Sequence, residues 1–474
     1  MQQTSLILRF TIKNLISSKL AVFLLVAFAV LQLFAAYSSY SFYQSQKEII
    51  AEYQTSSRAD WEGNPDKHPH RMAHYGNYAF RQPSALSVFD YGLDRYMGNA
   101  IFLESHVMNT SNFSEAEYSS GLVRFGFLDM GMILQLLTPL LIFFLGFNLI
   151  ASERENGSLK LSIAQGISWK NLIIGKSLAL FIFTSTLLLV PIGLLFFLAF
   201  AGEAQSLRIV LLAGLYLLYF LFLSFITTLV SAHAKSAKQA LNSLIGVWLL
   251  FFILLPKVSQ ALGAYFYEIP SKAKFALAVE EDIIKTGDSH NQDDPYYAFL
   301  KDSLLTAYNV ETVKELPFNY SGFQMKVGER ITTEIHQFHH DNLLDIYRNQ
   351  NRFSKIVSLI NPYLAVKNLS MAFAGTDFDA NVHFQEAAEE YRYYVSQKMN
   401  QLQIDLISNE SKGSSDPNHL LDKQYWADVE DFEHQQIPLT ASVSSEVLSV
   451  MSLLLWGILI AWGIYVSSKK LRAI

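Results

Sequence analysis

The tripeptide Gly175-Lys176-Ser177 offers the first hint of chemistry in this sequence. It has the form of the end of a nucleotide-binding P-loop, G-x-x-x-x-G-K-[ST], in which backbone amides hold phosphate and the lysine reaches the terminal phosphates. The loop needs a glycine five residues before Gly175, and that position holds Lys170. A P-loop also follows a buried strand, whereas this tripeptide lies between two very apolar segments. The sequence therefore argues against ATP binding by this chain.

Closely spaced histidines form the second set of candidates, because imidazole groups together with the thioether of Met72 would suit a copper or zinc ion. The residues that could serve as such ligands are His68, His70, His74, His336 and His340. The chain has no cysteine, and buried histidines often form hydrogen bonds inside a fold instead. The sequence therefore predicts no metal site and no cofactor on this chain.

Neighbouring carboxylates such as Glu280 with Glu281 could pair for acid and base catalysis. Adjacent acids on a polar helix are usually solvated, however, and the chain lacks the G-x-S-x-G and H-E-x-x-H patterns of hydrolases. No catalytic residues are predicted, and the chain is not expected to be an enzyme.

The composition is that of a membrane protein, because 51% of the 474 residues are hydrophobic and only 16% are charged. Six apolar blocks are long enough to cross roughly 30 Å of hydrocarbon as helices. They are residues 20–42, 127–151, 172–201, 207–231, 240–266 and 443–466. The first block is longer than the apolar core of a signal peptide, so it is expected to stay in the protein as a membrane anchor and not to be cleaved. The sequence thus predicts an all-α membrane protein with six transmembrane helices.

Basic residues between the apolar blocks set the predicted orientation, because lysine and arginine collect on the cytoplasmic side of a membrane. The segments that carry this excess are 1–19, 152–171, 232–239 and 467–474. Both termini are then cytoplasmic, and the long polar regions 43–126 and 267–442 lie outside. The first segment, 1–19, is predicted to be a helix in the inner membrane interface.

The two outer regions are predicted to build a mainly helical domain with minor β-structure. Residues 41–54 continue the first span as a stalk, and NAIFLES at 99–105 is expected to be a strand. Helical spacing of apolar residues is found at 294–310, 326–357 and 383–408. Without cysteine the domain must be held by packing alone. These features fit a bacterial inner-membrane protein with a large periplasmic domain.

The stretch 151–177, ASERENGSLKLSIAQGISWKNLIIGKS, has more structure than a plain loop requires. Asn156-Gly157 allows a turn, residues 158–164 form a short amphipathic piece, and Ser168 can cap the helix that follows. The pattern predicts a short cytoplasmic helix between the second and third spans.

This pattern resembles that of exporter-type (ABC-2-like) ABC transporter permeases, which commonly carry an E-R-E-x-G-[ST]-L run after the second span and a G-K further on. The matching residues are Glu153, Arg154, Glu155, Gly157, Ser158, Leu159, Gly175 and Lys176. The resemblance implies that Ser158 to Gly166 is the coupling helix on which a separate ATPase acts. Glu153 and Glu155 would offer it charge-assisted contacts. ATP and magnesium would bind that ATPase, and Gly175-Lys176-Ser177 would start the third membrane helix.

A narrower resemblance covers nearly the whole chain. It rests on PHRMAHYG at 69–76, GLDRYMG at 92–98, LESH at 103–106, RFGF at 124–127 and the segment 358–392. These look like a subfamily with two large extracytoplasmic insertions and a C-terminal domain of unknown function, related to the nitrous oxide reductase maturation permease. The positions that match the subfamily and are predicted to share a buried polar network are His70, His74, Asp90, Glu104 and His106.

The resemblance implies the permease subunit of an ATP-driven transporter that exports a substrate or delivers it outside the cytoplasm. Such subunits work in pairs, so the expected partners are an ABC ATPase, a second permease subunit (a copy or a paralogue), membrane lipid and an extracytoplasmic accessory protein, but no nucleic acid. One alternative is a mechanotransmission complex that acts on an envelope or periplasmic partner without bulk transport. Another is a membrane receptor or enzyme without an ATPase. The absence of buried charges within the spans argues against an ion-driven carrier, which usually needs titratable residues near mid-membrane.

Overall fold

The computed structural model describes residues 2–112, 128–291, 293–410 and 416–471. Within these ranges, six helices are long and apolar enough to cross a membrane. They are α2 (Lys19–Glu62), α6 to α8 (Met130–Glu155), α10 to α11 (Trp169–Phe200), α12 (Ser206–His233), α13 to α14 (Ala237–Phe266) and α22 (Val447–Lys470). The prediction of an all-α, multi-pass membrane protein is confirmed at this level.

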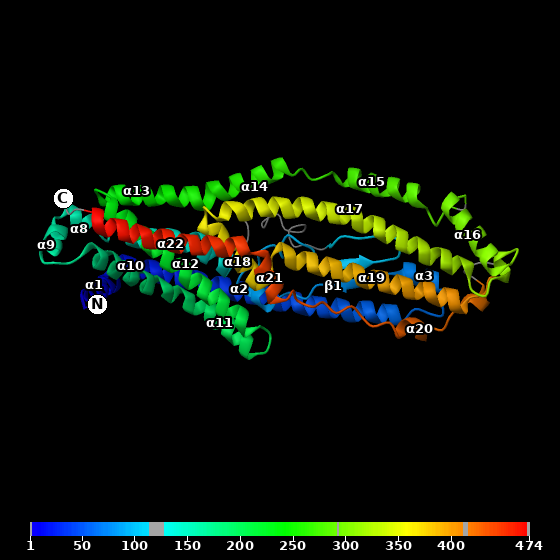
Figure 1. Cartoon of the computed structure of the whole chain (residues 1–474). Helices are drawn as coiled ribbons and strands as arrows, with labels where there is room; N and C mark the ends of the chain where they lie inside the picture. The colour runs from blue at the N-terminus through cyan, green and yellow to red at the C-terminus, as the bar shows by residue number, and fades with distance from the viewer. Residues whose placement is uncertain (1, 113–127, 292, 411–415, 472–474) are drawn as a thin grey trace.

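The bundle of apolar helices forms one end of an elongated molecule, and both chain termini lie at the outer edge of that end (Figure 1). This edge is called the terminal end below, and the helical assembly on the opposite side, residues 43–112 and 267–442, is called the distal domain. The helices outside the spans are α1 (Gln2–Ser17), α3 (Pro69–Tyr75), α9 (Ser158–Ala164), α15 (Lys272–Thr286), α16 (Pro295–Tyr308), α17 (Tyr320–Ser358), α18 (Pro362–Ala374), α19 (Phe378–Leu406), α20 (Gln424–Ala427) and α21 (Leu439–Ser445). Short 3₁₀ turns are η1 (Ala85–Val88), η5 (Val313–Glu315) and η6 (Pro417–His419).

The helix α2 is much longer than the predicted span 20–42. It runs without a break for 44 residues, or about 66 Å at 1.5 Å per residue, so its second half projects beyond the bundle as the predicted stalk. Ser18 caps its start, because the hydroxyl accepts a hydrogen bond from the backbone N–H of Ala21. The three helices predicted for the second polar region are confirmed as α16, α17 and α19. The motif at 124–127 and the last three residues of the basic segment 467–474 lie outside the described residues.

Three spans change helix type just before a proline. Proline lacks an N–H and clashes with the carbonyl group four residues earlier, so the preceding turn has to adjust. The adjusted turns are η2 (Ile133–Leu137) between α6 (Met130–Met132) and α7 (Thr138–Gly146), η3 (Thr186–Leu188) between α10 (Trp169–Ser185) and α11 (Leu189–Phe200), and η4 (Leu249–Leu254) between α13 (Ala237–Trp248) and α14 (Leu255–Phe266). Before Pro139, the carbonyl oxygen of Gln135 accepts a hydrogen bond from the Tyr219 hydroxyl at 3.0 Å. Neighbouring helices thus take up backbone groups that a proline leaves free.

The helix α1 is apolar on two sides, which explains why its sequence has no single hydrophobic face. Ile7 and Leu15 are buried against the bundle, whereas Leu6 and Phe10 are exposed. The close approach of α1 to α10 depends on Gly175, since a Cβ there would lie 2.8 Å from Cγ2 of Ile7. One face of α1 therefore packs on the bundle and the other is exposed, and its place in the membrane interface stays a prediction.

The distal domain is a set of long helices around one small sheet. The strands β1 (Asn77–Phe80) and β2 (Ala100–Leu103) pair antiparallel, which confirms the strand predicted at 99–105. The helices α17 and α19 lie side by side along the domain (Figure 1), and α19 also packs on α3 and β2. At the far end, Trp61 and Trp426 are fully buried and the indole N–H of Trp61 donates to the carbonyl oxygen of Trp426 at 2.8 Å. Buried aromatic packing and this hydrogen bond thus join the end of α2 to α20.

Arg208 fastens the distal domain to the bundle. Its side chain is buried at the start of α12, where one guanidinium nitrogen donates to the carbonyl oxygens of Ala372 and Phe373 at 3.1 and 3.2 Å. The other terminal nitrogen donates to the carbonyl oxygen of Ile437. The last carbonyl groups of a helix have no partner inside it, so Arg208 satisfies the end of α18 and holds it on the membrane helices.

His434 makes the distal domain sensitive to acid. Within the described residues, both ring nitrogens are buried without a hydrogen-bond partner, and the ring lies edge-on to Phe384. Burial, reinforced by the charge of Arg81, lowers the pKa of His434 to about 3, so the ring stays uncharged in the folded protein. An unfolded histidine titrates near 6.5. The contribution of neutral His434 to the free energy of unfolding is therefore complete above about pH 6.5. It is lost as the pH falls toward 3, at up to about 1.4 kcal/mol per pH unit.

We expect His434→Phe to reduce this loss of stability, because phenylalanine keeps the aromatic packing but has no proton to bind. The measurement is the unfolding temperature of wild type and variant at about pH 7.5 and about pH 5, because at the lower pH His434 binds a proton in the unfolded chain but not in the folded one. His383→Gln serves as a control, since His383 is a second histidine of the distal domain, on α19. An equal acid-induced drop in wild type and His434→Phe would contradict the assignment.

Candidate functional sites at the two ends of the molecule

At the terminal end, the predicted coupling segment forms two short helices joined by glycine turns. The helix α8 (Ala151–Glu155) is separated from α9 by Gly157, whose φ is 79°. After α9 the chain reverses at Gly166, whose φ is 89°. A Cβ at either glycine would meet no neighbouring atom, so glycine is required here by the left-handed backbone. The short helix predicted from Ser158 to Gly166 is present as α9 with its closing turn.

Glu153 and Lys176 form an ion pair beside α9. The Nζ atom of Lys176 lies 2.6 Å from a carboxylate oxygen of Glu153 and also donates to the carbonyl oxygen of Leu149. The lysine is 5% exposed, so its charge depends on these partners. The third membrane helix begins as α10 at Trp169 with Ser168 as its predicted cap, so Gly175-Lys176-Ser177 lies in its second and third turns and not at its first residue.

Arg154 is also turned inward. Its guanidinium group donates to the carbonyl oxygens of Ala232, at 2.8 Å, and Ala234 at the end of α12, and it lies over the ring of Trp169 at 5.9 Å. These contacts bind α8 to the ends of two other membrane helices. Of the two glutamates predicted to meet an ATPase, Glu153 is thus held by Lys176, while Glu155 is exposed.

The helix α9 has one anchored face and one free face. Leu159 is completely buried in a cluster that includes Ile7 of α1 and Ile173 of α10. Leu161 is 66% exposed, although it is a large apolar residue next to the exposed Lys160. The outer face of α9 thus presents a large apolar side chain at the terminal end.

In the distal domain, three histidines from two separate segments meet. His70 and His74 lie one turn apart on α3, and His106 follows β2. The ring centroids of His70 and His74 are 4.6 Å apart, and those of His74 and His106 are 5.2 Å apart. One nitrogen of each ring lies within 4.8 Å of the other two. Burial, reinforced by the neighbouring imidazoles, lowers the pKa of His70 to about 4 and also lowers the pKa of His74.

Buried charges support this histidine group. One carboxylate oxygen of Glu329 on α17 lies 2.9 Å from Nδ1 of His106 and accepts the backbone N–H of His106 at 3.0 Å. The other accepts a hydrogen bond from Arg392 on α19, which also pairs with Glu389 at 2.7 Å. Burial alone would raise the pKa of Glu329, but His106 and Arg392 outweigh it and lower the pKa to about 2. Glu329 is therefore a fixed negative charge behind His106.

The structure unites only part of the predicted polar network. His70, His74 and His106 meet, and Glu104 is close enough to favour the protonated form of His74. Asp90 was predicted to join them and does not. Its carboxylate instead accepts hydrogen bonds from Ser370 at 2.5 Å and Gln135 at 2.8 Å, where the distal domain meets the bundle.

The other predicted metal ligands lie outside the group of three. His68 faces His419, with ring centroids 6.2 Å apart, and His336 and His340 lie further along α17. Sequence reasoning missed His290, whose ring centroid is 4.8 Å from that of His106. It also missed Glu329 and Arg392. No local pattern could have indicated them, because the contacts span 223 residues between His106 and Glu329.

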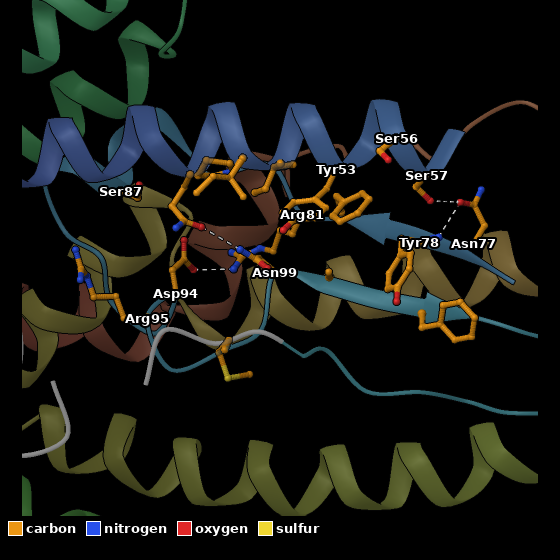
Figure 2. A pocket seen from close by; sticks show the side chains of 18 of the residues that line it. Tyr53, Ser56, Ser57, Asn77, Tyr78, Arg81, Ser87, Asp94, Arg95 and Asn99 are labelled. Carbon is orange, nitrogen blue, oxygen red and sulfur yellow. Dashed lines mark hydrogen bonds and ion pairs between the residues drawn. The ribbon is translucent and has the colours of Figure 1, made fainter. Parts of the chain in front are cut away.

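A cavity of about 710 Å³ lies between α2 and the two-stranded sheet. Figure 2 shows its polar residues, with Arg81 and Asp94 paired at 2.7 Å on one side and the hydroxyl of Ser57 donating to Asn77 at 2.8 Å on another. Tyr53 and other aromatic side chains supply much of the remaining wall. A largely apolar cavity with a few polar groups is typical of small-molecule sites.

The fold and these sites define a class: a six-span membrane protein with a short anchored helix between its second and third spans and a helical distal domain. A protein-family model described as Domain of unknown function (DUF3526) matches residues 272–435. The matched region runs from α15 through α20 and includes Glu329 and Arg392, but none of the six spans. No curated protein and no solved structure matches the chain.

Proposed function

We propose that this chain is the permease subunit of an ATP-driven ABC transporter and that α9 is the helix through which a separate ATPase acts on it. The observation that carries the proposal is the construction of α9. Its inner face is anchored by Leu159, whereas Leu161 is exposed at the terminal end. In this proposal the terminal end faces the cytoplasm and the distal domain lies outside.

The contacts of α9 provide a route for force. A push on α9 reaches α1 and α10 through Leu159. Through the adjoining α8 it also reaches α12, because Arg154 of α8 is bonded to Ala232 and Ala234. At its other end, α12 is bound to the distal domain through Arg208. Nucleotide-driven movement of α9 would thus be passed along one membrane helix to the distal domain, without any catalytic group on this chain.

The cavity beside α2 gives the proposal a place for cargo. It lies in the distal domain beyond the apolar part of α2, and its wall combines aromatic groups with the Arg81–Asp94 pair. Such a wall suits an amphipathic molecule with a large apolar part. In this proposal the cargo binds outside the membrane, and the spans transmit movement.

The first experiment is purification of the chain from its native cells in a mild detergent, followed by mass spectrometry of every protein that remains bound. Retention of an ATPase with a complete P-loop would support the permease function. An envelope protein retained with that ATPase, together with no movement of cargo across the membrane, would favour force transmission instead. Absence of any ATPase in several detergents would refute the proposal and favour a receptor or enzyme.

Leu161→Asp is expected to weaken ATPase association about tenfold or more, because a charge replaces the apolar contact of a short docking helix. The measurement is the amount of ATPase retained by the purified variant and its cargo-stimulated hydrolysis. Phe299→Asp is the matched control, since Phe299 is equally exposed, at 72%, but lies on α16 in the distal domain. Full ATPase retention by Leu161→Asp would remove α9 as the docking element.

A further inference from the structure

The histidine group of the distal domain has the arrangement of a metal site. His70 and His74 are four residues apart on α3, so both rings project from the same side of one helical turn. The third ring comes from His106, whose φ of 67° turns the chain sharply just after β2. The ligand nitrogens of all three lie within 4.8 Å of one another. Two separate segments are needed to produce this convergence.

The surroundings of His106 orient its ring as in known metal sites. Metal-bound histidines usually give their other ring nitrogen to a carboxylate, which fixes the tautomer and the ring direction. Glu329 occupies that place, 2.9 Å from Nδ1 of His106, and is itself held by Arg392. Nε2 of His106 is then the nitrogen available to an ion.

We propose that His70, His74 and His106 bind a divalent transition metal ion in the distal domain. Three imidazole ligands favour Zn²⁺, Ni²⁺ or Cu²⁺ over Mg²⁺ and Ca²⁺, which prefer oxygen ligands. A zinc ion with bonds of about 2.1 Å places its ligand nitrogens about 3.4 Å apart, so small rotations of the rings complete the site. Glu104 or water supplies the fourth ligand.

The position of the site gives the ion a structural consequence. The three ligands belong to the first polar region, and Glu329 behind His106 belongs to the second. An ion would therefore hold α3 to the turn after β2 and strengthen the attachment of both to α17. Because this inference concerns ion binding alone, it stands independently of the proposed permease function.

The test uses the full chain, purified in detergent without a polyhistidine tag and stripped with a chelator. Zn²⁺ is added, unbound metal is removed by gel filtration, and bound metal is measured by mass spectrometry. We expect one Zn²⁺ per chain, no comparable binding of Mg²⁺, and a higher unfolding temperature with Zn²⁺. His74→Gln should weaken Zn²⁺ binding by at least about tenfold, and the exposed position of His74 allows this variant to fold.

His383→Gln is the matched control, because His383 lies in the same domain on α19 but outside the group of three. It should bind Zn²⁺ as the wild type does and show the same rise in unfolding temperature. Equal binding by wild type and His74→Gln would show that the ion sits elsewhere. Failure of the stripped wild type to bind Zn²⁺, Ni²⁺ or Cu²⁺ would also overturn the proposal.

Discussion

Arg392→Met is expected to lower the stability of the folded chain by about 3–5 kcal/mol, because it leaves a buried carboxylate without its main counter-charge. Glu329 is completely buried, and Arg392 also pairs with Glu389 and donates to the Thr333 hydroxyl at 2.9 Å. Methionine fills much of the same volume, so the loss reports charge and hydrogen bonds more than packing. The unfolding temperature of the purified variant measures the effect, and we expect a drop of several degrees.

Arg348→Ala is the matched control for this substitution. Arg348 bridges the same two helices, because it lies on α17 and its guanidinium is 3.8 Å from Glu386 on α19, but its side chain is 46% exposed. An exposed ion pair contributes about 0–1 kcal/mol, so this variant should unfold close to the wild-type temperature. An equally small drop in unfolding temperature for Arg392→Met and Arg348→Ala would show that the buried charges do not hold α17 on α19.

Glu153→Ala is expected to be the most damaging single change at the terminal end. It removes the carboxylate from Lys176, whose ammonium group remains buried with the carbonyl oxygen of Leu149 as acceptor. Loss of one member of a buried pair costs about 3–5 kcal/mol. We expect about 2–4 kcal/mol here, because the Glu153 side chain is 28% exposed and water can partly replace it. Yield of the folded chain in membranes and its unfolding temperature are the measurements.

The double variant Glu153→Gln with Lys176→Met separates this cause from others. It removes both charges together, and replacement of a buried pair by neutral groups is often close to neutral in stability. The double variant should therefore recover most of the stability that Glu153→Ala loses. Glu155→Ala should leave the fold unchanged because Glu155 is exposed. A double variant as unstable as Glu153→Ala would show that the ion pair does not carry the effect.

Glu153 and its neighbours make contacts in the structure that differ from the roles predicted from their sequence motif. The E-R-E run was predicted as part of a coupling segment, with Glu153 as a contact for an ATPase, and the G-K pair as the opening of the third span. In the structure, Glu153 pairs with Lys176 and Arg154 binds the end of α12, while Gly175 makes room for Ile7. These residues hold α8, α10 and α1 together. Glu155 and the outer face of α9 are exposed, and under the proposed function they are the surface that an ATPase would meet.

The sequence by itself determined the elements that depend on local patterns. Apolar blocks of sufficient length predicted the six spans, since a chain crossing hydrocarbon must satisfy its backbone within each helix. The glycine turn at Gly157, the cap at Ser168 and the strand at 99–105 were likewise predicted from residues close together in the chain. The predicted helix ends were less exact. The helix α2 continues beyond the predicted span to Glu62, because the stalk contains no glycine or proline that would end the helix.

Only the tertiary structure decided which distant side chains meet. His106 lies 32 residues after His74 and 223 before Glu329, and no periodicity links such positions. The tertiary structure also places Asp90 apart from the histidines. Its carboxylate accepts hydrogen bonds from Ser370 and Gln135 at the junction with the bundle. Burial of a charge requires a partner, but the partner comes from whichever helix packs against it. Tertiary packing therefore brought the three histidines together and formed the buried ion pairs, which the order of residues alone leaves open.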